Sequence, residues 1–522
     1  MAPGKTWNRR LALVGGAALA FLLLASLPTR AETVLNRGGG AEPESLDPAF
    51  AGSVAEINIL GDMMVGLTTL DAAARPIPGI AERWETSPDG LTWTFHLRQA
   101  RWSDGRPVTA QDFVFAWRRL LDPKTAARQA QMLWIVKHAR GITGGRLPAS
   151  ALGAAASGPS TLKVTLEHPA PYLPELLSLP AALPLPARPV FKPGAYISNG
   201  PYLLKSWRPN DHVGLVKNPQ FYDAASVKID VVNYYPINDT QAALRQLRAG
   251  ELDMQTPLPV AQLAWIRANM PGSLHIIPSQ ALAYIAMNLR DPALADLRVR
   301  RALNLVYDRE AVAQKVMKLG EQPAYSYVPP TIADYAGGPQ LDFKSMPYPA
   351  RLAEAKRLMQ EAGYGQFNKL ILTYSISGNP DSKRLAAVFQ AMARQIHVDV
   401  RITVSDYPMV LSAMRQGRYQ LAYTIWLADF SDASNFLDLL RSGSPGNYAG
   451  YRNPKFDLAM ARAAGEAGRR KNLLQEAERI ALTDMPWLPI RFLSQPEAVG
   501  PRVGGYVQNI RDYNRSRWLW IK

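Results

Sequence analysis

The chain has 522 residues, of which 47% are hydrophobic, and a formal net charge of +16. This length is enough for two or three domains with sizeable cores. The sequence contains no cysteine, which excludes disulfides, thiolate metal sites, a cysteine nucleophile and a lipid anchor on cysteine. The basic residues are spread along the whole chain and form no Lys/Arg block, so the charge does not indicate nucleic-acid binding.

The N-terminus has the pattern of a secretory signal peptide. Lys5, Arg9 and Arg10 give a basic start, an apolar run covers residues 11–27, and Ala31 is a small residue at a cleavage position. We expect cleavage after about Ala31, leaving a periplasmic protein that is not lipidated. The alternative is a retained membrane anchor, but the run is short for a span and a polar segment with turn signals follows it.

Residues 33–36 predict a short strand that runs into Gly38, Gly39 and Gly40. Three consecutive glycines permit a close approach to the backbone. No Gly-Lys-Ser/Thr follows them, so they do not form a phosphate-binding loop.

Further along, Trp93, Phe95 and Leu97 alternate with polar residues and predict a half-buried strand. Thr109 and Asp112 have the spacing of a capping box, which predicts a helix through Leu120. The stretch 147–193 is rich in Ala and Pro, with eight prolines from Pro169 to Pro193. It predicts an irregular, surface-crossing connection at a domain junction.

Helices and strands alternate through residues 350–430. The pattern predicts helices at 351–362, 383–395 and 410–415, and strands at 370–372, 398–404 and 421–425. Alternation at this spacing is typical of βαβ units, so we expect a parallel sheet covered by helices.

In open α/β sheets, ligands bind beyond the carboxyl ends of the strands. The predicted strands bring Asp429, Trp426 and Tyr407 to such an edge. A carboxylate there can pair with an ammonium group, and aromatic faces can hold apolar side chains or cations. Two alternatives stay open at this point: Asp429 as a turn residue that caps the next helix, and Trp426 as a core residue.

The sequence offers no convincing catalytic or metal site. None of the six histidines has the spacing of a zinc motif, so we expect no metal and no cofactor. Ser160 and Lys163 match the spacing of a serine acyltransferase, which requires a helix. However, Leu162, Val164 and Leu166 alternate like a strand, and the partner motifs of such enzymes are missing. We therefore predict a protein that is not an enzyme.

Several blocks of sequence identify a family. Trp102-Ser103-Asp104-Gly105 opens the most recognisable of them; the full set covers residues 44–48, 102–113, 199–202, 299–303, 323–330, 428–430 and 503–506. On these residues the chain resembles the periplasmic oligopeptide-binding proteins of ABC importers, in the large peptide and nickel solute-binding family. The resemblance covers essentially the whole chain after the signal peptide.

The resemblance implies an α/β fold of the periplasmic-binding-protein type, with two lobes that close around a hinge and an extra domain, three domains in all. Lobe I would be discontinuous. The implied segments are 32–54, 179–280 and 497–522 for lobe I, 55–178 for the extra domain, and 281–496 for lobe II.

The resemblance also implies a peptide ligand with a free α-ammonium, which Asp429 would bind. The peptide backbone would pair with Arg37, Gly38 and Gly39 on one lobe and with residues 425–427 on the other. Aromatic positions of the family's side-chain pockets fall on Tyr407, Trp426 and Tyr284, and Leu427 lies beside them. Arg37 and Arg415 are further candidates for ligand contact. Because the receptor would bind the peptide through its main chain, it would accept peptides with a wide range of side chains.

This chain departs from the family's pattern in two respects, a missing disulfide and missing cations for the peptide carboxylate. The positions of a family disulfide hold Ala281 and Leu427, and the positions of cations that bind the peptide carboxylate hold Ser382, Met414 and Tyr423. Arg415 or Arg418 could replace those cations. The ligand could therefore be a murein peptide or another modified peptide, and a metal chelate or haem is a further alternative. We expect a monomer that delivers its ligand to a permease and ATPase complex in the inner membrane.

Overall fold

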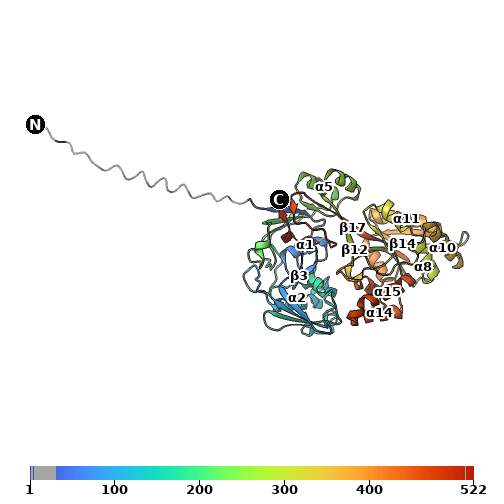
Figure 1. Cartoon of the computed structure of the whole chain (residues 1–522), viewed down its shortest axis with the longest axis horizontal. Helices are drawn as coiled ribbons and strands as arrows, with labels where there is room; N and C mark the ends of the chain where they lie inside the picture. The colour runs from blue at the N-terminus through green and yellow to red at the C-terminus, as the bar shows by residue number, and fades with distance from the viewer. Residues whose placement is uncertain (2–3, 5–30, 512) are drawn as a thin grey trace.

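The computed structural model describes residues 1, 4, 31–511 and 513–522. The predicted signal peptide therefore lies largely outside the described residues. Two lobes stand side by side, and strands β12 (Leu274–Met287) and β17 (Trp487–Val499) lie between them (Figure 1). Among the described helices, none is both long and apolar enough to cross a membrane.

One large mixed sheet runs through both lobes. Its strands, in spatial order, are β15 (Val398–Ser405), β14 (Leu370–Ser377), β16 (Leu421–Leu427), β12, β17, β11 (Met254–Gln255), β1 (Val34–Gly38), β10 (Val231–Tyr235), β9 (His212–Lys217) and β8 (Tyr202–Arg208). The short strand β13 (Gln322–Pro323) pairs with β17.

The two long strands cross from one lobe to the other as an antiparallel pair. Near one end, Leu274 to Pro278 pair with Ala498 to Ser494, and beyond an interruption the pairing resumes between Leu282 and Phe492. An irregularity of this kind locally breaks the hydrogen-bond ladder and bends the strand. The break, between Pro278 and Leu282, includes the predicted boundary between lobe I and lobe II.

The α/β pattern predicted for residues 350–430 is confirmed. Strand β14 is parallel to both β15 and β16. The connecting helices are α11 (Pro380–Arg394) and α12 (Tyr407–Arg415), and α10 (Tyr348–Glu361) precedes the first strand. The same half of the chain contains α8 (Leu297–Val306), α9 (Arg309–Ala311), α13 (Ser434–Leu437), α14 (Pro454–Gly465) and α15 (Arg470–Asp484).

A separate antiparallel sheet lies within residues 55–178. Its order is β4 (Ala81–Thr86), β5 (Thr92–Leu97), β7 (Thr161–Thr165) and β6 (Ala154–Ala156), and α2 (Ala110–Leu121) packs on it. Helix α2 begins at the predicted capping box of Thr109 and Asp112. It buries Phe113 and Trp117, and each such side chain contributes about 1.5–3 kcal/mol. The domain boundaries given above stay a prediction.

One expectation about this region was wrong. Residues 147–193 were predicted to be an irregular surface connection, but they contain β6 and β7, and Leu176, Leu177 and Leu183 are buried in the core. Proline interrupts helices and ladders without forcing a segment to the surface. Lys163 lies on β7, as predicted, so it cannot meet Ser160 in the helical geometry of a serine acyltransferase.

Candidate functional site

Strand β16 has an open edge. On one side all its residues, Leu421 to Leu427, pair with β12. On the other side only Leu421 and Ala422 pair with β14, and no strand in the described part of the chain pairs there with residues 423–427. A strand edge of this kind presents unpaired N–H and C=O groups, which an extended peptide can use to add itself to the sheet.

Asp429 stands just beyond this open edge. Its backbone is held from two sides, because its N–H donates to Oδ1 of Asn435 at 3.4 Å and its carbonyl accepts a 2.6 Å bond from Nη2 of Arg511. The side-chain carboxylate forms no hydrogen bond or ion pair with another described residue. Burial raises the pKa of Asp429 to about 6. A half-buried carboxylate without a counter-charge is the arrangement that a ligand cation would complete.

The turn after Asp429 is stabilised by a different carboxylate. Asp432 Oδ1 accepts hydrogen bonds from the backbone N–H and the hydroxyl of Ser434, and it pairs with Arg470 at 2.7 Å. The rival interpretation, in which Asp429 caps the next helix, therefore does not fit the structure.

Trp426 and Leu427 lie on opposite faces of β16. Leu427 is 56% exposed and Ile425, on the same face, is 39% exposed. Trp426 is partly buried and its indole Nε1 donates to Asn435 Oδ1 at 2.8 Å. One amide oxygen of Asn435 thus holds both Trp426 and the backbone of Asp429. Tyr407 is exposed and begins α12, directly after β15.

Tyr284 was predicted to line a side-chain pocket of the cleft, but the structure places it in the core. It is only 2% exposed and stacks on Trp487, with ring centroids 4.2 Å apart. It pairs with Thr424 across the sheet, which turns its ring away from the face of Ile425. Burial raises its pKa well above the ordinary value for tyrosine.

Arg37 and Gly38 are internal to the first lobe's sheet, which contradicts their predicted role as open backbone partners. Strand β1 is flanked by β10 along its whole length, and β11 pairs with Arg37 and Gly38 on the other side. The Arg37 guanidinium is buried and bonds to the carbonyl of Asn514 at 2.6 Å. Gly39 donates its N–H to the carbonyl of Tyr235 at 2.9 Å.

Arg415 also lies away from the site. It is exposed in the last turn of α12, and that helix runs back from the edge where Tyr407 stands. Nine residues of helix span about 13 Å, which carries Arg415 away from the edge where Tyr407 and Asp429 stand. The resemblance places the cations that bind the peptide carboxylate at three positions, which in this chain are buried and hold Ser382, Met414 and Tyr423.

Contacts between segments far apart in the sequence gather around Asp429, and sequence reasoning missed them. Glu175, from the segment 55–178, pairs with Arg511 and accepts the N–H of Ser431 at 2.9 Å. The rings of Tyr172 and Phe430 stack at 4.1 Å with an interplanar angle of 11°. These partners are far apart in the sequence and belong to no local motif, so no pattern could have identified them.

A cavity of about 670 Å³ continues from Asp429 into the space between the segment 55–178 and lobe II. Trp134, Tyr172, Asp429, Phe430 and Arg441 are among its lining residues. Of the residues predicted for ligand contact, it includes Asp429 alone. No cluster of three or more potential metal-ligating His, Cys, Asp or Glu side chains occurs within the residues that the structure describes.

A two-lobed α/β fold with an open strand edge and an unpaired carboxylate between the lobes is the architecture of a solute receptor. A sequence profile of the bacterial extracellular solute-binding proteins, family 5 middle region, matches residues 75–448. The chain belongs to this family.

Characterised relatives agree with this assignment. The chain is 34% identical over 509 residues to the periplasmic oligopeptide-binding protein OppA of Escherichia coli (strain K12), covering 95% of this chain and 93% of the relative. The structure of the Escherichia coli murein tripeptide binding protein MppA superposes with a TM-score of 0.81 at 32% identity, over 94% and 99% of the chains. Haemophilus influenzae OppA in complex with the peptide RPPGFSPFR gives a TM-score of 0.79 at 32% identity and the same coverage. The predicted fold of two lobes, a hinge and an extra domain is confirmed.

Proposed function

We propose that this protein is the periplasmic receptor of an ABC importer and captures extended oligopeptides with a free α-ammonium between its lobes. One observation carries the proposal: the open edge of β16 ends at Asp429, whose half-buried carboxylate is paired with no cation of the described chain. A peptide laid along residues 423–427 supplies backbone partners to that edge and an ammonium group to that carboxylate.

The electrostatics favour an ammonium ligand. Keeping Asp429 ionised at neutral pH is unfavourable without a counter-charge, since burial raises its pKa to about 6. Binding an ammonium removes that cost. Truncating one partner of such a buried pair typically costs about 2–5 kcal/mol of binding free energy. Because the remaining bonds go to peptide main chain, the receptor accepts many side chains.

Three of the predicted residues keep a role in side-chain contact. Leu427 and Tyr407 offer exposed apolar and aromatic surface at the cleft edge, and Trp426 is a partly buried residue of the open strand itself. Tyr284, Arg37 and Arg415 are not part of this proposal because of their positions. The protein acts as a monomeric carrier, without catalysis, and hands its ligand to a membrane permease and ATPase complex.

Titration calorimetry with trialanine and N-acetyl-trialanine tests the proposal. The free peptide should bind and the acetylated peptide should lose most of its affinity, since acetylation removes the ammonium charge. Asp429→Asn should abolish this difference. Asp406→Asn is a matched control, because Asp406 is an exposed carboxylate at the same edge of lobe II. Equal affinity of the wild-type protein for both peptides would overturn the role of Asp429.

Mass spectrometry of material released on denaturing the purified protein identifies the natural ligand. Peptides with free N-termini are the expected result, and a murein peptide is included in that class if its α-ammonium is free. A haem or metal chelate as the dominant released species would contradict the proposal.

A further inference from the structure

A second cavity lies in lobe II, apart from the open edge of β16. It has a volume of about 240 Å³, and it shares no lining residue with the cavity at Asp429 or with β16. Its walls come from the loop that follows β13, from α15 and from β17. Pockets for drug-sized ligands measure about 300–1,000 Å³, so this cavity has the size for a smaller molecule than a peptide.

A buried carboxylate without a counter-charge lines this cavity. Glu478 is 0% exposed. Its Oε1 accepts the backbone N–H groups of Tyr327 and Val328, at 2.7 and 2.9 Å. Its Oε2 accepts the hydroxyl of Tyr335 at 2.7 Å. Lys344 also lines the cavity but is exposed, and no cation of the described chain forms an ion pair with Glu478. Burial raises the pKa of Glu478 to about 7.

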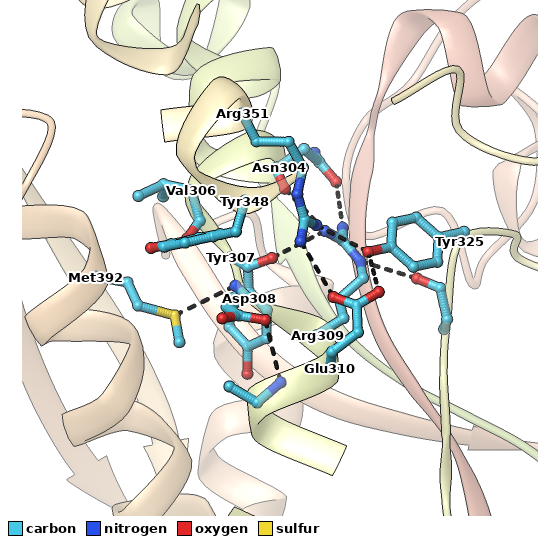
Figure 2. Close-up of polar contacts among 12 residues, drawn as sticks. Asn304, Val306, Tyr307, Asp308, Arg309, Glu310, Tyr325, Tyr348, Arg351 and Met392 are labelled. Carbon is cyan, nitrogen blue, oxygen red and sulfur yellow. Dashed lines mark hydrogen bonds and ion pairs between the residues drawn. The ribbon is translucent and has the colours of Figure 1, made fainter. Parts of the chain in front are cut away.

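A nearby carboxylate has the cation that Glu478 lacks. Figure 2 shows Tyr325 and Arg351 converging on Glu310. The Tyr325 hydroxyl donates to Oε1 of Glu310 at 2.6 Å, and Nη2 of Arg351 lies 3.1 Å from Oε2. Burying a charge is costly unless a partner of opposite sign balances it. Glu478 has hydrogen-bond donors alone, so a cation that enters the cavity completes its surroundings.

The other lining residues indicate which kind of cation fits. Three buried aromatic side chains line the cavity: Tyr325, Tyr335 and Phe492. Aromatic faces attract organic ammonium ions, and proteins recognise such ions with cages of aromatic residues. A calcium ion requires about six to eight oxygen ligands, and the described residues hold no cluster of three or more His, Cys, Asp or Glu side chains that could bind a metal. The lining therefore favours an organic ammonium ion over a metal ion.

The walls of the cavity are fixed by the fold. Nε of Arg309 donates to the carbonyls of Ala324 and Pro489, at 2.9 and 2.8 Å, and so holds the lining loop against β17. Phe492 pairs with Leu282, the first pair beyond the break in the ladder of β12 and β17. The cavity thus lies beside the strands that join the lobes. Because its walls are formed before a ligand arrives, binding carries little cost of ordering.

We infer that this cavity is a second ligand site, in which Glu478 and the aromatic residues around it bind a small organic ammonium ion. The ammonium group meets Oε2 of Glu478, which accepts only the Tyr335 hydroxyl among the described residues. Gly338 leaves this oxygen accessible, since a Cβ there would lie 3.4 Å from it. The alkyl part of the ion contacts the apolar lining, which includes Pro329 and Pro330. The site does not depend on the function proposed for the cleft.

Calorimetry with choline and its neutral carbon isostere dimethylbutanol tests this inference. At pH 8.5 Glu478 is ionised, since its pKa is about 7. Choline should bind about tenfold or more tightly than the alcohol, because the two differ in charge and hardly in shape. Butylamine and butanol form a second pair. Preference for either ammonium over its alcohol supports the site, and the stronger of the two identifies a quaternary or a primary ammonium as the ligand.

Variants locate the binding. Glu478→Gln should lower the affinity for choline by about tenfold or more, and Glu476→Gln, at an exposed carboxylate on the same helix, should leave it unchanged. Phe492→Leu removes an aromatic wall and keeps the hydrogen bonds of Glu478, so the affinity should fall by about threefold. This second variant carries the test if Glu478→Gln does not fold. Asp429→Asn should bind choline as the wild type does, which separates this site from ammonium binding in the cleft.

Three results would overturn the inference. The first is no choline binding, or equal affinity for each ammonium and its alcohol. The second is an unchanged affinity for choline in either Glu478→Gln or Phe492→Leu. The third is loss of choline binding in Asp429→Asn, which would place the ion in the cleft.

Discussion

Nη2 of Arg511 donates a 2.6 Å hydrogen bond to the backbone carbonyl of Asp429. The two residues lie in different lobes in the predicted division of the chain, and the same guanidinium pairs with Glu175 of the segment 55–178. The residue proposed to bind the ligand ammonium is thus held in place by residues from across the cleft. We therefore expect lobe closure and recognition of the peptide N-terminus to be coupled through this contact.

Removing Arg511 should weaken ligand binding through Asp429. Hydrogen bonds that involve a charged group contribute about 1.5–3 kcal/mol, so Arg511→Gln should lower the affinity for trialanine by roughly that free energy. A double-mutant cycle with Asp429→Asn, measured by calorimetry, should show a clear interaction between the two positions. Additive effects would mean that Arg511 stabilises the closed protein without positioning Asp429.

The stack of Phe430 on Tyr172 should contribute to closure. Aromatic pairs contribute about 0.5–1.5 kcal/mol beyond the area they bury, so Phe430→Leu should shift the equilibrium towards the open form. Fluorescence energy transfer between dyes on the two lobes would report this shift. Val190→Ala, at an exposed apolar position, is a control that should leave the transfer efficiency unchanged.

Affinity for peptides with a free N-terminus should depend on pH through Asp429. The ammonium binds the ionised carboxylate, and the pKa of this group in the ligand-free protein is about 6. Affinity should be level above pH 7 and should fall by up to about tenfold per pH unit below pH 6. Calorimetry between pH 4.5 and 8 measures this profile. The affinity of the Asp429→Asn protein should not fall below pH 6. If its affinity fell as in the wild-type protein, another group would be responsible for the pH dependence.

Asp429 should also reduce the stability of the ligand-free protein. Its pKa is raised in the folded state, so its protonated form favours folding and this contribution is lost as the pH rises from about 4 to about 6. At pH 7.5 the cost is at most about 3 kcal/mol. Asp429→Asn should therefore raise the free energy of unfolding of the empty protein at pH 7.5, in chemical denaturation, while it removes binding. A lower stability in that variant would contradict the absence of a counter-charge.

Sequence patterns predicted the helices and strands well where the apolar residues of a segment follow the spacing of a single helix or strand. The alternating residues of β15 and the capping box of α2 encode their own structures, since strand and helix periods are local properties. The carboxyl ends of the parallel strands then placed Asp429 and Tyr407 at one edge. Proline content misled the prediction for 147–193, because burial there depends on packing with distant segments.

The geometry of the site was harder to predict. The sequence could not indicate that Tyr284 packs on Trp487, or that two strands flank Arg37 and Gly38, because both depend on pairing between segments hundreds of residues apart.

A crystal structure of the protein with bound trialanine tests the central claim most directly. The account predicts the peptide ammonium within about 3 Å of the Asp429 carboxylate, a charge-assisted hydrogen bond, with the peptide backbone paired to residues 423–427 of β16. An ammonium group placed elsewhere, with Asp429 still unpaired, would contradict it.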